Sequence, residues 1–158
     1  MEGMDDIAVS FLDRGTVEAD MNFVVDGHAV ATASNRSPEH DYAEFVVWKL
    51  VVETPETTIL WDTGSHPDAG DGYWPTPLYE AFAHVDADQH ALSDDLGSAG
   101  YSITDIDAVV MSHLHLYHAC GIYNFAGTDV PSHGHREELP LAELSAKTHE
   151  GYNPYLPI

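Results

Sequence analysis

The stretch I-T-D-I-D-A-V-V-M-S-H-L-H-L-Y-H, residues 103–118, joins a buried-strand pattern to a cluster of three histidines. Its first part, residues 103–111, ends in a continuous apolar run, which is typical of a strand inside a domain. His113, His115 and His118 follow directly. Residues two apart at the end of a strand point the same way, so His113 and His115 can present nitrogens to one point. A turn can bring His118 beside them.

Three imidazoles so close together indicate a metal site. Neutral imidazole is a good zinc ligand, and a catalytic zinc typically takes three protein groups and leaves a position for water. Chance is the alternative, because a chain of 158 residues with 11 His produces some close pairs. Three His within six residues directly after an apolar strand favour the metal site over chance.

The remaining strand signals lie mostly upstream of this segment. Residues 45–52, F-V-V-W-K-L-V-V, predict one buried strand, and residues 57–61 predict a second that returns after a turn at Thr54-Pro55-Glu56. Asp62-Thr63-Gly64 ends this hairpin with residues suited to a tight turn. Residues 7–12 and 21–25 are weaker strand candidates, whereas residues 33–41 and 67–77 are expected to be loops.

Helical spacing of apolar residues predicts helices over residues 78–85 and 89–96, and a last helix over residues 141–147 after Pro140. The hydrophobic fraction of 44% is enough for one sizeable core, and no linker or repeat divides the chain. We therefore expect a single α/β (α+β) domain over residues 1–158.

The charge balance excludes several classes of protein. Five Lys and Arg against 27 Asp and Glu give a net charge of −22, which repels nucleic acids and anionic membranes. One cysteine cannot form an internal disulfide, and no run of apolar residues is long enough for a membrane span. These observations predict a cytoplasmic protein without nucleic-acid or membrane partners. The acidic residues are spread along the whole chain, which favours adaptation to a high-salt cytoplasm over an ordinary acidic surface.

Residues 105–121 resemble the signature segment of the metallo-β-lactamase superfamily, whose motif is H-x-H-x-D-H, and are most like its N-acyl homoserine lactonase branch. Three further segments resemble that branch: residues 15–20, the D-T-G strand end at residues 59–64, and H-R-E-E at residues 135–138. The resemblance implies a partial αββα sandwich that lacks the C-terminal half of the family's domain.

The resemblance also assigns roles to residues of this chain. His113 and His115 would hold the first zinc, and His118 would belong to the second. Asp62 would lie beneath them and accept hydrogen bonds from the ligating rings, although it could also simply cap its turn. The implied activity is a zinc-dependent hydrolysis in which activated water attacks a lactone or ester-like carbonyl.

The chain departs from the family pattern in two ways. Tyr117 stands where the motif has Asp, and a phenol is a poor metal ligand at neutral pH. Tyr117 is the candidate catalytic residue of this motif if it contacts metal or substrate, and a packing residue otherwise. The family's later His and Asp ligands are absent, and the chain's other histidines that could replace them, His133, His135 and His149, fall in expected loops. One or two zinc ions are therefore expected, and the second site lacks its carboxylate.

Three hypotheses follow from these residues. The first is a lactonase-type hydrolase that uses zinc and a small lactone or ester substrate. The second is a shortened, non-catalytic relative that at most binds metal and pairs with a second chain. The third, a histidine-rich metal-binding protein unrelated to hydrolysis, is disfavoured by the D-T-G segment. A half-sandwich would expose apolar strand edges, so self-association is expected.

Overall fold

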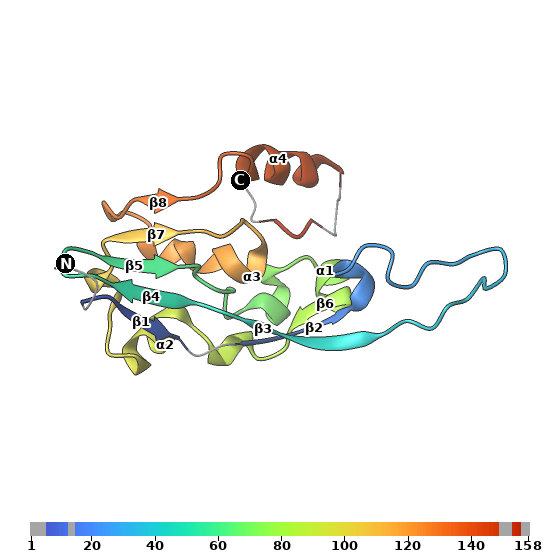
Figure 1. The fold of residues 1–158 in the computed structure, drawn as a ribbon, viewed down its shortest axis with the longest axis horizontal. Coiled ribbons are helices and arrows are strands. Elements are labelled where there is room, and N and C mark those ends of the chain that lie inside the picture. The colour runs from blue at the N-terminus through green and yellow to red at the C-terminus, as the bar shows by residue number, and fades with distance from the viewer. Residues whose placement is uncertain (1–5, 13–14, 149–152, 156–158) are drawn as a thin grey trace.

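The computed structural model describes residues 6–12, 15–148 and 153–155. The described chain forms two β-sheets with short helices between and around them (Figure 1). The larger sheet has the order β1-β4-β5-β7-β8, with strands at Ala8–Phe11, Leu50–Glu53, Thr58–Trp61, Ala108–Val110 and Ser132–His133. The smaller sheet has the order β3-β2-β6, with strands at Tyr42–Val47, Gly15–Asp20 and Phe82–His84.

Four α-helices complete the described architecture: α1 (Thr76–Ala81), α2 (Leu92–Ser98), α3 (Leu116–Ala119) and α4 (Glu138–Thr148). Short helical turns of other types are η1 (Met21–Phe23), η2 (Ala69–Tyr73), η3 (Ala87–Gln89), η4 (Ile103–Asp105) and η5 (Cys120–Phe125). The mixture of sheets and helices confirms the expected α/β class. No helix in the described part of the chain is long and apolar enough to cross a membrane.

The main core lies against one face of the larger sheet. Val51, Leu60 and Val109, from the three central strands, are fully buried there. Leu92 and Leu96 of α2 pack against them. The parallel pairing of β5 with β7 brings the ends of these two strands together, although the strands are about fifty residues apart in the sequence. The D-T-G turn and the three-histidine segment therefore leave the sheet side by side.

The prediction of one strand over residues 45–52 was wrong. The chain changes sheets within this run, because β3 ends at Val47 in the smaller sheet and β4 begins at Leu50 in the larger one. Lys49 lies between them, is buried, and forms an ion pair with Asp95 of α2. A continuous apolar run indicates that its residues are buried, but it does not indicate to which sheet each half of the run belongs. The change of sheet could therefore not be predicted from the apolar pattern.

The strand predicted over residues 21–25 was also wrong. The strand there is β2, which ends at Asp20, and the Asp20 side chain then accepts a hydrogen bond from the Asn22 backbone at 2.8 Å to start η1. The predicted loop at residues 33–41 is confirmed. It belongs to an arm, residues 24–41, that extends away from the body of the protein (Figure 1).

The helix predictions are right only in part and are shifted. The predicted helix over residues 78–85 is α1 followed by the short strand β6, which pairs with β2. The second begins at Leu92 rather than at residue 89, and α4 contains the predicted 141–147 segment. Residues 67–77, expected to be a loop, include η2 and the first turn of α1. Short helices and edge strands share apolar spacings, so their boundaries depend on tertiary pairing.

Gly15 at the start of β2 has no room for a side chain. A Cβ there would lie 1.7 Å from Nε2 of His84, which is itself 2% exposed. Burial lowers the pKa of His84 to about 4, so its ring is neutral at physiological pH. The ring cannot move away easily, because its Nδ1 bonds to the Ser65 hydroxyl at 2.5 Å.

Gly15→Ala should therefore destabilise the protein by about 1–3 kcal/mol, as overpacking does. Gly97→Ala is the matched control, because a Cβ at this position in α2 meets nothing within 4 Å. The control should be neutral or more stable by about 0.5–1 kcal/mol, since alanine is the better helix former. Urea unfolding of both variants measures the difference, and equal stabilities would contradict the packing of His84 against Gly15.

Candidate active site

Asp62 lies where β5 leaves the sheet and is almost completely buried. Its backbone has a φ of 57°, and its N–H donates to the Val110 carbonyl at 2.9 Å. Asp tolerates this left-handed conformation better than most residues do. The carboxylate accepts hydrogen bonds from the Ser112 N–H at 2.7 Å and from the Ser112 hydroxyl at 2.7 Å. The end of β5 is thus tied to the residue just before the histidine cluster.

The same carboxylate also holds His118, whose Nδ1 lies 2.7 Å from Oδ2 of Asp62. An ionised carboxylate only accepts hydrogen bonds, so Nδ1 of His118 carries a proton, and the neutral tautomer of this ring leaves a free electron pair on Nε2. Ser112 donates its own proton to Asp62, so its oxygen accepts from Nδ1 of His113, 2.9 Å away. His113 therefore also presents Nε2 as a ligand atom.

The D-T-G turn is fixed to the carbonyl of His118 as well. The backbone N–H groups of Thr63 and Gly64 donate to this oxygen at 2.7 Å and 3.1 Å, and the Thr63 hydroxyl donates at 3.0 Å. Gly121 packs against the turn so closely that a Cβ there would lie 2.2 Å from the Thr63 carbonyl oxygen. The turn and the histidine segment therefore form one rigid unit.

The three imidazoles are close neighbours. The ring centre of His113 lies 4.5 Å from that of His115 and 4.2 Å from that of His118. Burial and the neighbouring His118 lower the pKa of His113. Burial, followed by His113 and His118, lowers the pKa of His115 to about 4. Both rings are thus neutral at physiological pH, which is the form that binds metals.

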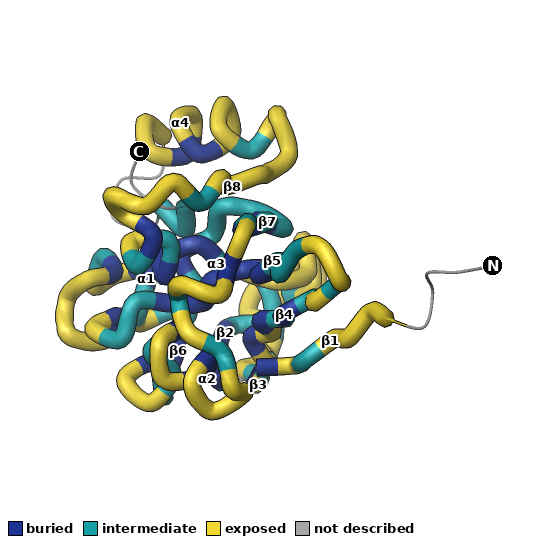
Figure 2. The backbone as a smooth tube through the Cα atoms, turned by 90° about the vertical axis from the view of Figure 1, so that its left-hand side faces the viewer, coloured by how far each residue is buried: buried dark blue, intermediate teal, exposed yellow. Residues whose placement is uncertain are grey.

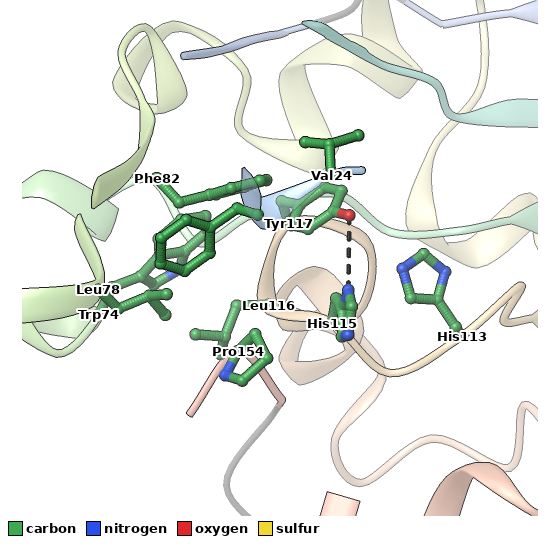
Figure 3. A pocket seen from close by; sticks show the side chains of 10 residues that line it. Val24, Trp74, Leu78, Phe82, His113, His115, Leu116, Tyr117 and Pro154 are labelled. Carbon is green, nitrogen blue, oxygen red and sulfur yellow. Dashed lines mark hydrogen bonds between the residues drawn. The ribbon is translucent and has the colours of Figure 1, made fainter. Parts of the chain in front are cut away.

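Tyr117 packs and makes a polar contact at the same time. Its hydroxyl lies 3.4 Å from Nδ1 of His115 (Figure 3), and its ring lies 5.0 Å from that of Phe82. Burial, with a smaller effect of Asp62, raises the pKa of the phenol. Tyr117 therefore stays neutral and cannot supply the anionic oxygen of the motif's carboxylate.

A mostly apolar cavity of about 260 Å³ opens beside the cluster. It is lined by Phe23, Val24, Trp74, Leu78, Phe82, His113, His115, Leu116, Tyr117 and Pro154. Figure 3 shows the apolar side chains at one end and His113 with His115 at the other. A small molecule in this cavity would have an apolar part among Trp74, Leu78 and Phe82 and a polar part at the two imidazoles.

Segments near the C-terminal end complete the rim of the site. The Glu138 carboxylate at the start of α4 accepts a hydrogen bond from the Leu114 N–H at 3.1 Å. The Pro154 carbonyl accepts one from the Leu116 N–H at 2.8 Å, and the Tyr155 ring lies 4.6 Å from that of His115. Glu138 is therefore a structural contact of the histidine segment.

The donor set fits a divalent ion by its chemistry, but the observed arrangement does not converge on one. Within residues 6–12, 15–148 and 153–155, no group of three or more His, Cys, Asp or Glu side chains is placed to hold a metal ion together. The site also lacks the carboxylate of the family motif, because Tyr117 takes its place. By their chemistry the imidazoles fit a single divalent ion, and without the motif's carboxylate they do not fit a two-metal centre.

A family model described as the metallo-beta-lactamase superfamily matches residues 44–152, which is more than half of the chain. The match includes the D-T-G turn and the three-histidine segment. This chain belongs to the metallo-beta-lactamase superfamily. The sequence resemblance and the expected fold class are thereby confirmed.

Two curated relatives of this superfamily member are N-acyl homoserine lactonases. The AiiB enzyme of Agrobacterium fabrum (strain C58) is 27% identical over 147 residues, and that of Rhizobium rhizogenes (strain K84) is 29% identical over the same length. Each alignment covers 92% of this chain and 52% of the relative. This superfamily member therefore spans about half the length of the curated relatives that it matches.

Solved structures show the same fold. An N-acyl homoserine lactone hydrolase with N-hexanoyl-L-homoserine bound at its catalytic metal centre aligns with a TM-score of 0.64 at 24% identity, covering 94% of this chain and 53% of that one. A quorum-quenching N-acyl homoserine lactone hydrolase aligns with a TM-score of 0.66 at 23% identity, covering 98% and 53%. The similarity extends over nearly all of this superfamily member.

The structure brings all five residues singled out from the sequence into one place: Asp62, His113, His115, Tyr117 and His118. It leaves His133 and His135 exposed, although His133 lies in the short strand β8 and not in the expected loop, and His149 lies outside the described residues. Cys120 is a buried residue. Trp74 lines the cavity, whereas the neighbouring Tyr73 does not.

Sequence reasoning missed three contacts of this site. Ser112 was part of the quoted segment, but only the fold shows that it connects Asp62 to His113. Glu138 accepts a hydrogen bond from the Leu114 backbone, a contact that the H-R-E-E segment did not predict. Phe82 was assigned to a helix, so its position beside Tyr117 was not visible. The available sequence signal for Ser112 was its position directly before His113.

Asp62→Asn tests the role of the carboxylate. The Asn amide has one oxygen where Asp62 has two, so it cannot accept all three hydrogen bonds. The variant should therefore lose about 1–3 kcal/mol of stability. Its zinc affinity should fall by about 10–100-fold, since the rings lose their fixed orientation. Urea unfolding and calorimetric zinc titration measure both effects. Asp88→Asn, at an exposed position, is the control, and the same loss in both variants would contradict the role of Asp62.

Proposed function

We propose that this chain is a metal-dependent hydrolase of the lactonase type. His113, His115 and His118 would hold a divalent ion such as zinc, and a small lactone or ester would be the substrate. The observation that carries the proposal is the buried Asp62 carboxylate, which directs Nε2 of both His113 and His118 away from itself. The lactonase names of the relatives and the apolar cavity beside the imidazoles support the substrate class.

In this proposal, the residues around the cavity have separate roles. Asp62 and Ser112 hold the rings of His113 and His118 in orientation. Trp74, Leu78 and Phe82 take up the apolar part of the substrate and exclude water from it. The neutral Tyr117 hydroxyl, 3.4 Å from His115, is placed to donate a hydrogen bond to a substrate oxygen at the polar end of the cavity. A bound divalent ion supplies polarisation of the carbonyl and activation of water.

A non-catalytic role is the second candidate, and one observation favours it. Tyr117 replaces the motif's carboxylate, so the group that would hold a second ion and transfer a proton is absent. In that case the chain binds metal through the imidazoles but does not turn over a lactone. The cytoplasmic location and the adaptation to high salt that the composition predicts stay predictions for either candidate.

Zinc binding and lactone hydrolysis separate these candidates. We expect the intact chain, in high-salt buffer, to bind about one zinc and to hydrolyse N-hexanoyl homoserine lactone only when zinc is present. Zinc content is measured by plasma emission spectrometry, and ring opening by proton NMR. His113→Ala combined with His115→Ala should abolish both.

The double variant His133→Ala and His135→Ala is the matched control, because it removes the same number of histidines from exposed positions. It should retain zinc and activity. Bound zinc without hydrolysis would establish the non-catalytic candidate and refute the enzyme. Absence of saturable zinc binding would refute both.

A further inference from the structure

The D-T-G turn makes a second set of contacts, with residues that lie outside the histidine cluster. Residues 62–65 are all buried. Figure 2 shows buried backbone around β5 and α3, between which the turn lies. Ser65 directly follows the turn, and its hydroxyl oxygen lies 2.5 Å from Nδ1 of His84 in β6. The turn is therefore attached to the smaller sheet as well as to the histidine segment.

The charge of Asp86 decides which nitrogen of His84 carries the proton. Burial keeps this ring neutral, since it lowers the pKa of His84 to about 4. Nε2 of His84 lies 3.3 Å from Oδ1 of Asp86, and a carboxylate attracts a proton on this nitrogen and repels an electron pair there. Nδ1 is therefore the unprotonated nitrogen, and it accepts the hydrogen bond that the Ser65 hydroxyl donates.

The start of β2 fixes the side of the His84 ring that carries Nε2. Gly15 lies so close to this nitrogen that a Cβ there would approach it to 1.7 Å. The Thr16 N–H donates a hydrogen bond to Oδ1 of Asp86 at 2.6 Å, which holds the carboxylate beside the ring. The ring is 2% exposed. His84 is thus a rigid partner for Ser65.

A second buried side chain, Lys49, reaches the turn at Gly64. A Cβ on Gly64 would lie 3.0 Å from Cδ and 3.3 Å from Nζ of Lys49. The ammonium group forms an ion pair with Asp95 and donates to the His90 carbonyl at 3.4 Å. Moving a buried lysine away from its carboxylate leaves an uncompensated charge, which is strongly unfavourable. The glycine of the turn is therefore in contact with a side chain that is itself held in place.

The contacts of Ser65 and Lys49 belong to one continuous set. The ring of His90 joins them, since its Nε2 lies 3.7 Å from Oδ2 of Asp86 and its Nδ1 lies 3.6 Å from Oδ1 of Asp95. A buried polar network whose members have partners makes its surroundings rigid. We call the following six residues the inner polar network: Lys49, Ser65, His84, Asp86, His90 and Asp95.

We propose that His84 is a positioning residue of the metal site, which it serves by holding Ser65 and thereby the D-T-G turn. The turn places the Asp62 carboxylate 2.7 Å from Nδ1 of His118, and a displacement of the turn would lengthen this hydrogen bond. The inner polar network then acts on the histidine cluster through Asp62. This role rests on the proposed metal binding, whereas the placement of Asp62 can be measured without a metal.

His84→Leu and His84→Asn are a matched pair of variants. Leu and Asn side chains branch at the same atom, and both lack the part of the ring that faces Asp86. Only Asn keeps a hydrogen-bonding atom near the position of Nδ1, so only Asn can still accept from Ser65. A role confined to packing would affect both variants equally. Ile106→Ala, a truncation in the main core, is the control for lost stability.

The tautomer of His118 in the metal-free protein is the first readout, measured by long-range proton–nitrogen NMR correlations. The wild type, His84→Asn and Ile106→Ala should carry the proton on Nδ1, whereas His84→Leu should contain a mixture of both tautomers. Circular dichroism verifies that His84→Leu is folded. Ser65→Ala, which removes only the hydroxyl, replaces it otherwise, with the same expected mixture.

Zinc affinity, measured by calorimetric titration, is the second readout. His84→Leu should bind zinc about 10-fold more weakly than the wild type, and His84→Asn should stay within about 3-fold of it, as expected for outer contacts of a metal site. A wild-type chain that binds no zinc would refute the proposed function, and the tautomers alone would then decide the role of His84. An unchanged His118 tautomer in the folded His84→Leu variant, or the same mixture in His84→Asn, would overturn the proposal.

Discussion

The buried carboxylate of Asp62 is the interaction on which the site depends. It accepts hydrogen bonds from the backbone and hydroxyl of Ser112 and from the ring of His118, each at 2.7 Å. These contacts join the end of β5 to the end of β7, which only the parallel pairing of the two strands brings together. Through Ser112 the carboxylate also fixes His113. A single buried charge thus sets the protonated nitrogen of two imidazoles.

The part of the chain that aligns with about half of each relative's length contains some features of the family's site and lacks others. The aligned half contains the complete Asp62 network, the three imidazoles and the apolar cavity beside them. It does not contain a carboxylate at position 117, and the neutral phenol there cannot replace the missing charge. These residues support the proposed binding of one ion and a small apolar ligand, and the proposed hydrolysis depends on the role of Tyr117.

The sequence predicted which residues lie together better than it predicted the topology. The D-T-G turn and the spacing of His113, His115 and His118 predicted one cluster, because these residues are close in sequence or carry a recognisable motif. The change of sheet at Lys49 was not predictable, since burial on either side of it looks the same in a run of apolar residues. Ser112 and Glu138 were missed for a related reason: their roles arise from backbone contacts that only the folded chain creates.

The tautomers of the histidine rings give the most direct test of this account. Long-range proton–nitrogen NMR correlations in the metal-free protein distinguish a proton on Nδ1 from one on Nε2 for each neutral imidazole. The account predicts that both His113 and His118 carry the proton on Nδ1, and that Asp62→Asn abolishes this preference. A proton on Nε2 of His118 in the wild-type protein would contradict the central role of the Asp62 carboxylate.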